Sequence, residues 1–192
     1  MKKPLLIGAT LLVVLSLTGC ACERITNIFI GGQSSVKENQ EESKEKEYKY
    51  DDFLILIADA KFSFDYKKCT ENLDNNGEKS TQVYTYDKEN NNWYYLDEIN
   101  NTKITTDLDI KTFLRQCKDI ATGIGQEIDD AFKFSASSER YLINSHFSHS
   151  SKQVDGQYEF NSCGLMTLFD TKETDLDSIE STTYKAIYTY YK

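Results

Sequence analysis

The sequence predicts an α+β fold, a curved antiparallel β-sheet with an N-terminal helix and a central helix packed on one face. Two observations predict it. Segments in which apolar and polar residues alternate fill most of residues 61–106 and 132–191, which is the period of half-buried strands. Segments of helical period come before the first group and between the two groups. A helix packed on an antiparallel sheet is the usual α+β arrangement.

The domain is expected to begin with a helix near Tyr50. Asp51 and Asp52 suit the first turn of a helix, where acidic groups complement the macrodipole. Phe53, Leu56, Ile57 and Ala60 follow at helical spacing. Because residues 53–57 are all apolar, a buried strand is the alternative for this segment.

A meander of strands is expected next. In residues 61–67, Phe62, Phe64 and Tyr66 alternate with polar residues and predict the first strand. The segment 73–78, with Gly77, predicts a turn. Further strands are expected at 80–87, 93–99 and 102–106, which are rich in β-branched and aromatic residues.

The helical period then returns. The segment Thr106 to Asp109 resembles a capping box, and Gly123 is a natural stop. The apolar stripe between them consists of Ile110, Phe113, Leu114, Cys117, Ile120 and Ala121. A short helical turn is expected near 125–132, followed by strands at 131–137, 139–147, 157–170 (opened by Gly156) and 183–192.

The N-terminal segment predicts a secreted, membrane-anchored protein. Lys2 and Lys3 precede an apolar run to Leu17, which is shorter than the ~20 residues that a spanning helix needs. Residues 17–20, Leu-Thr-Gly-Cys, resemble a bacterial lipobox, which implies lipidation of Cys20 and a cell-membrane protein on the extracytoplasmic face. An uncleaved anchor is the alternative. The Lys, Asn, Ile and Tyr content is typical of a Gram-positive host.

The predicted organisation is a signal peptide (1–19), a lipidated cysteine with a charged, disordered tether (20–49) and one domain (50–192). The tether has too few apolar residues to repay the entropy of ordering. The chain carries a net charge of −9, and loses two positive charges with the signal peptide. Such acidity argues against binding to nucleic acid or to anionic lipid headgroups. The composition does not define an oligomeric state.

Few residues suggest catalysis or metal binding. Cys69, Cys117 and Cys163 have no zinc-like spacing, and we interpret them as packed thiols, with one disulfide as the alternative and a catalytic thiol as a more distant one. His146 and His149 are the only histidines, and lack the partners of a metal motif. No metal, cofactor or catalytic residue is therefore predicted, and a hydrolase is the remote alternative.

The strand rhythm and aromatic placement of KFSFDYKKC, STQVYTYD and NNWYYLDEI resemble those of Firmicute lipoproteins and of the LolA/LppX-like half-barrel. The resemblance implies a lipid or another hydrophobic or amphipathic ligand. A cystatin/NTF2-like cone is the competing architecture. The predicted ligand-binding residues are Phe62, Phe64, Tyr84, Tyr86, Trp93, Tyr95 and Phe113. A surface module that docks peptide, protein or glycan, without an internal ligand, is the alternative function.

Overall fold

The structure, a computed structural model, describes residues 44–97 and 99–192 of the 192-residue chain. The predicted signal peptide, Cys20 and most of the predicted tether lie outside the described residues. The described part begins just before the first strand, β1, and includes every predicted ligand-binding residue.

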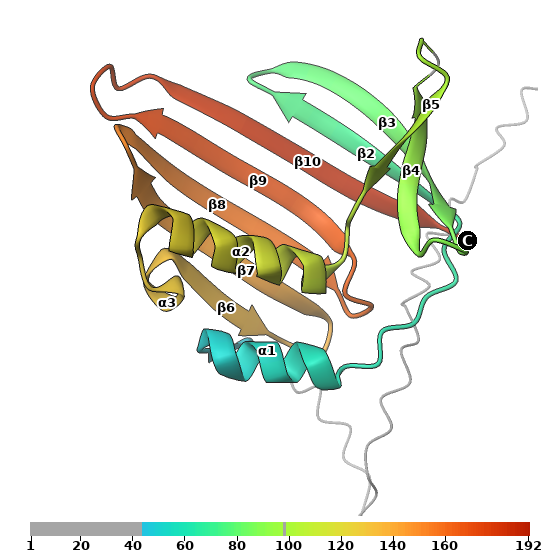
Figure 1. Ribbon diagram of the computed structural model, residues 1–192, viewed down its shortest axis with the longest axis horizontal. Helices are drawn as coiled ribbons and strands as arrows, with labels where there is room; N and C mark the ends of the chain where they lie inside the picture. Colours follow the sequence, from blue (N-terminus) through green and yellow to red (C-terminus); the bar gives the residue numbers. More distant parts are fainter. Residues whose placement is uncertain (1–43, 98) are drawn as a thin grey trace, which may run out of the picture.

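One open sheet of ten strands forms the body of the described part, and every strand pair is antiparallel (Figure 1). The strands are β1 (Lys46–Tyr48), β2 (Lys68–Asn75), β3 (Glu78–Asp87), β4 (Asn92–Asp97), β5 (Thr102–Thr106), β6 (Phe132–Ala136), β7 (Arg140–His149), β8 (Lys152–Asn161), β9 (Met166–Asp175) and β10 (Ser181–Tyr191). Their order in the sheet is β1-β6-β7-β8-β9-β10-β2-β3-β4-β5.

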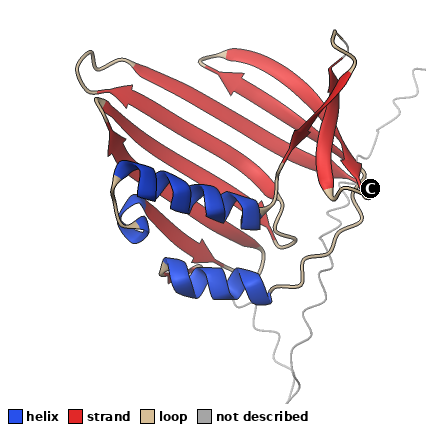
Figure 2. Cartoon of the chain, viewed as in Figure 1, coloured by secondary structure: helices blue, strands red, loops and turns tan. Residues whose placement is uncertain are grey.

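Within the described residues, three helices accompany the sheet: α1 (Tyr50–Asp59), α2 (Ile110–Ile124) and the short α3 (Ile128–Ala131). All three lie toward the β6–β8 half of the sheet (Figure 2). The prediction of an α+β fold built on an antiparallel sheet is confirmed at this level.

The sheet joins two meanders that are separate in the sequence. Strands β2–β5 form one, strands β6–β10 form the other, and β10 pairs with β2 to unite them. Eight residue pairs join β10 and β2, from Tyr184 opposite Asn75 to Tyr191 opposite Lys68. The last strand of the chain therefore lies inside the sheet, not at its edge.

Aromatic and aliphatic side chains of α1 and α2 form the core against β6–β8. Phe53 of α1 is fully buried, with its ring centroid 5.3 Å from that of Phe134. Phe113 of α2 lies 4.6 Å from Tyr158. The predicted stripe of α2 is buried except for Ile120, which is 40% exposed.

Residues 61–67 are not a strand, contrary to the prediction. The alternation is present, since Phe62, Phe64 and Tyr66 are half-buried between exposed neighbours. However, residues 61–67 are not assigned to a strand. The last of them, Lys67, bonds to the sheet by donating to Tyr191 and accepting from Tyr86. The alternation thus reflects the burial of one side of an extended segment. The strand β2 begins only at Lys68, directly after this segment.

One predicted turn and one predicted strand start were misplaced. The first hairpin turns at Asn76 and Gly77, which have φ of 52° and 88°, so Leu73 to Asn75 belong to β2 and not to a turn. Two successive positive φ values are typical of the tight type I′ hairpin turn. Gly156 does not open a strand, because it lies in the middle of β8.

The caps of α2 also differ from the prediction. Asp109, not Thr106, is the N-cap, and its carboxylate accepts a hydrogen bond of 2.9 Å from the Thr112 backbone N–H. Gly125, not Gly123, ends the helix with φ of 71°.

The chain also forms structure earlier than expected. Residues 46–48, which the prediction placed in the disordered tether, form the edge strand β1 beside β6. Tyr48 explains this difference, because it packs 6.0 Å from Phe53 and gives an otherwise charged segment one apolar anchor.

Candidate ligand-binding site

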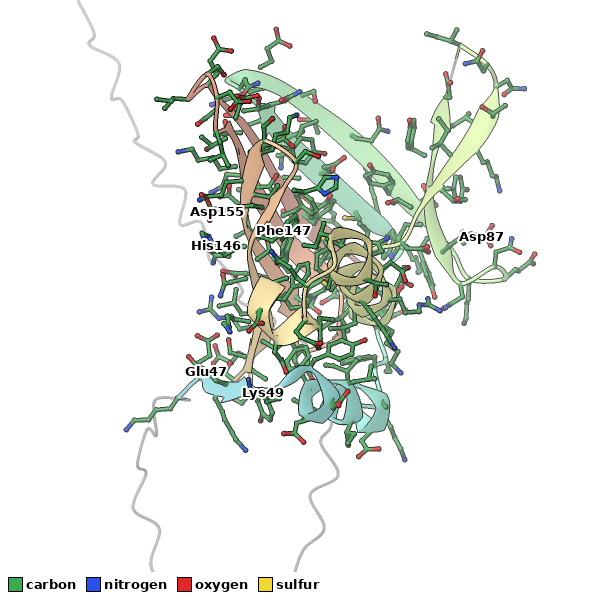
Figure 3. The ribbon with its side chains drawn as sticks, turned by 60° about the vertical axis from the view of Figure 1, so that its left-hand side comes forward. Glu47, Lys49, Asp87, His146, Phe147 and Asp155 are labelled. Atoms are coloured by element: carbon green, nitrogen blue, oxygen red, sulfur yellow. The ribbon has the colours of Figure 1, made fainter. Side chains whose placement is uncertain are left out.

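The inner face of the sheet, defined as the face that carries α1 and α2, continues beyond the helices. Tyr158 packs against Phe113 of α2 and, with ring centroids 5.0 Å apart, against Phe169 of β9. Phe169 in turn packs against Tyr184 of β10, with ring centroids 5.5 Å apart. Because alternate residues share a face, Tyr188 of β10 and its partner Glu71 of β2 point the same way. The sheet bends so that the β4–β5 hairpin stands apart from β7–β9 (Figure 3).

The seven predicted ligand-binding residues divide by burial. Tyr84, Trp93 and Phe113 are less than 10% exposed and belong to the core. The other four, Phe62, Phe64, Tyr86 and Tyr95, are half-buried and pack against the core.

The structure does not gather these seven residues into one group. Phe64, Tyr86 and Trp93 form a cluster with centroid separations of 5.0, 5.1 and 6.2 Å. Tyr84 and Tyr95 form a separate T-shaped pair at 5.7 Å.

The remaining two residues lie elsewhere in the core. Phe113 packs against Tyr158, and Phe62 lies 5.8 Å from Tyr141. Tyr66, the third aromatic residue of segment 61–67, lies 5.4 Å from Tyr190. The three rings of this segment thus pack against partners on four different strands.

A buried carboxylate that the sequence analysis did not single out lies beside the Tyr84–Tyr95 pair. Glu71 is 7% exposed. Its Oε2 accepts a hydrogen bond of 2.7 Å from the Tyr84 hydroxyl, and its Oε1 accepts one of 2.8 Å from the Tyr188 hydroxyl. The sequence analysis predicted no strand at this position; the pairing of β2 with β10 sets Tyr188 opposite Glu71.

The tyrosine hydroxyls around Glu71 are protonated donors. Burial, followed by the hydrogen bond to Glu71, raises the pKa of Tyr84 and of Tyr188 well above its usual value. Burial, together with the charge of Glu71, also raises the pKa of Tyr184. Two hydroxyls, one from β3 and one from β10, therefore donate to one carboxylate.

The three cysteines of the domain are buried thiols, as predicted. Burial raises the pKa of Cys69 and that of Cys117 to about 12. Since the thiolate is the reactive form, these two thiols are poor nucleophiles at neutral pH.

The histidines lie on the last residues of β7. His146 Nδ1 is 2.6 Å from Asp155 Oδ1, and this hydrogen bond lowers the pKa of Asp155. His146 and Asp155 occupy the outer side of the sheet (Figure 3), and His149 is exposed. In the described ranges, no group of three or more His, Cys, Asp or Glu side chains could hold a metal ion.

Two surface pockets are lined by other residues. One of about 680 Å³ lies between β1 and α3, with Lys46, Asp52 and Lys133 among its walls. The other, of about 530 Å³, lies beside Glu127 and His146. Neither pocket includes a predicted ligand-binding residue, and both have charged walls.

Comparison with family models, curated proteins and solved structures finds no match for this chain. Among the helices of the described residues, none is long and apolar enough to cross a membrane.

Proposed function

We propose that this chain is an extracytoplasmic lipoprotein, anchored through Cys20, that binds a hydrophobic or amphipathic ligand on the inner face of its sheet. The anchor rests on the lipobox pattern of residues 17–20. Two acyl chains hold a protein stably at a bilayer, which would keep the domain close to lipids. The ligand-binding part is non-enzymatic.

The observation that carries the proposal is the incomplete covering of the inner face. Tyr95, Tyr184 and Tyr188 point to this face from β4 and β10 yet are only half-buried, whereas Tyr158 beneath α2 is 6% exposed. Half-covered aromatic rings offer apolar contact area together with a polar hydroxyl. That combination suits a ligand with apolar and polar parts.

The architecture is compatible with this role. An open antiparallel sheet with helices over half of it resembles the LolA/LppX-like half-barrel in outline, and we propose that shape over the cystatin/NTF2-like cone. The resemblance rests on arrangement alone, because no solved structure matches the chain.

A fluorescence titration with N-phenyl-1-naphthylamine, an apolar probe that brightens outside water, tests the proposal. Tyr95→Ser should lower the affinity for the probe by a factor of about five to ten, since a buried aromatic contact is worth roughly 1 kcal/mol or more. Tyr94→Ser is the matched control. Tyr94 is the neighbouring residue on β4, and its ring faces Lys103 at 4.3 Å instead.

Equal affinities in these two variants would place the probe elsewhere, and an unsubstituted chain that binds no probe would contradict the proposal. Native mass spectrometry of the chain purified from its host provides a second readout. A retained lipid mass is expected.

The alternative function, a surface module that docks a partner, is favoured by exposed apolar side chains at two hairpins. Ile99, between β4 and β5, is 93% exposed, and Ile179, between β9 and β10, is 81% exposed. If this function holds, Ile179→Ser weakens partner binding and leaves probe binding unchanged.

A further inference from the structure

No cation among the described residues forms an ion pair with the buried carboxyl group of Glu71. Its two hydrogen-bond donors, Tyr84 and Tyr188, are neutral phenols. None of the ion pairs within residues 44–97 and 99–192 includes Glu71. A buried carboxylate is costly unless a positive charge accompanies it, so this position favours a cation.

The surroundings of Glu71 are aromatic on several sides. Tyr84 and Tyr188 donate to the carboxylate, and Tyr95 packs edge-on against Tyr84. Tyr184 lies on the same face of β10 as Tyr188. Tyrosine rings attract cations through the negative potential of their faces. A carboxylate beside several such rings is the chemical environment that recognises an ammonium group.

The charges on neighbouring inward positions agree with this preference. In β2, β3 and β10, the inward residues beside Glu71 are Cys69, Leu73, Gln82, Tyr84, Ala186 and Tyr188, and none is cationic. The lysines of these strands, Lys68, Lys79 and Lys185, face the other way. Lys185 pairs with Asp170, and Lys79 lies opposite Asp74.

We infer that the inner face holds a site for the ammonium group of an amphipathic ligand, built by Glu71, Tyr84, Tyr95, Tyr184 and Tyr188. This inference rests on the proposed function and specifies the headgroup of its ligand. Glu71 supplies the counter-charge, and the half-buried rings of Tyr95 and Tyr184 contact the ammonium group. The apolar part of the ligand extends along the same half-covered face.

Calorimetry with two amphiphiles of equal chain length tests the inference. The protein is the full chain with Cys20→Ser, and the ligands are octyltrimethylammonium and the uncharged octyl glucoside, both below their micellar concentrations. The cation is expected to bind about tenfold more tightly or better, through its attraction to the carboxylate and the rings. This comparison needs no substitution within the domain.

Glu71→Gln should lower the affinity for octyltrimethylammonium by about tenfold and leave that for octyl glucoside unchanged. Asp74→Asn is the matched control. It removes the same charge from the same strand, on the opposite face, and keeps the oxygen that accepts from Gly77. Circular dichroism checks that both variants fold. If Glu71→Gln does not fold, Tyr184→Leu replaces it and should show the same selective loss.

The outcomes separate the two proposals. If neither amphiphile binds, the proposed function and this inference both fail. If both bind equally and Glu71→Gln changes nothing, amphiphile binding stands and the ammonium site is wrong. Dihexanoyl phosphatidylethanolamine and octylammonium distinguish the source of the group. Binding of both supports a lipid headgroup, and binding of octylammonium alone supports a free amine.

Discussion

At the scale of single residues, Gly156 shows how closely the inner face is packed. A Cβ at this position would lie 2.4 Å from the Tyr158 hydroxyl oxygen and 2.5 Å from Ser145 Oγ. Both of those residues are buried, and the rings of Phe113 and Phe169 both pack against that of Tyr158. A shift of the ring away from a new methyl group would therefore disturb these contacts.

We expect Gly156→Ala to lower the free energy of unfolding by about 1–3 kcal/mol, the usual cost of overpacking a core. Gly123→Ala is the control, since a Cβ there meets nothing within 4 Å, and it should raise stability by about 0.5–1 kcal/mol as glycine is replaced within a helix. Urea denaturation measures both values. A neutral Gly156→Ala would show that the Tyr158 ring is loosely held.

Cys117 provides a prediction about pH. Burial raises its pKa from 9.0 to about 12, so between these values the unfolded chain releases a proton that the folded chain retains. Cys117 therefore leaves the free energy of unfolding unchanged below pH 9. Above pH 9 it lowers that free energy by up to about 1.4 kcal/mol per pH unit. Cys117→Ala should show a shallower alkaline decline in urea midpoints. An unchanged slope would mean that the thiol ionises normally when folded.

At the scale of elements, α2 depends on its N-cap. Asp109→Ala removes the bond to the Thr112 N–H and should cost about 1 kcal/mol. Asp107→Ala, at an exposed position two residues earlier, should be near neutral, as should Thr106→Ala. Thermal unfolding of the three variants tests this. A larger loss for Thr106→Ala would support the capping box that the sequence suggested.

The segment 61–67 shows why an element can be predicted correctly in its pattern and wrongly in its type. Alternation of Phe62, Phe64 and Tyr66 with polar residues is satisfied by any extended chain with one side buried. Strand formation additionally needs a neighbouring backbone. Here the rings pack against residues of β3, β4, β7 and β10, while the segment itself is not part of a strand.

At the scale of the whole molecule, β10 is the strand that unites the sheet. Deletion of residues 181–192 would separate β9 from β2 and expose both strands along their length. We expect loss of cooperative unfolding, since two half-sheets with open edges would remain.

Deletion of residues 1–48 is the control for that experiment. It removes only the short edge strand β1 from the described sheet, so a cooperative transition at lower temperature is expected. Differential scanning calorimetry distinguishes the two. A cooperative transition after removal of β10 would show that the two meanders are independent.

The sequence by itself determined the fold class, two of the helices, the hairpin rhythm and the burial of three cysteines. These depend on local period and on side-chain hydrophobicity, which neighbouring residues reveal. Tertiary structure alone decided that β10 lies beside β2, because strand pairing between distant segments depends on backbone hydrogen bonds that leave no local trace. The same pairing places Tyr188 against Glu71. Glu71 and Tyr188 are 117 residues apart in the sequence. Glu71 is therefore recognised as the centre of the proposed site only once the fold has brought β2 and β10 together.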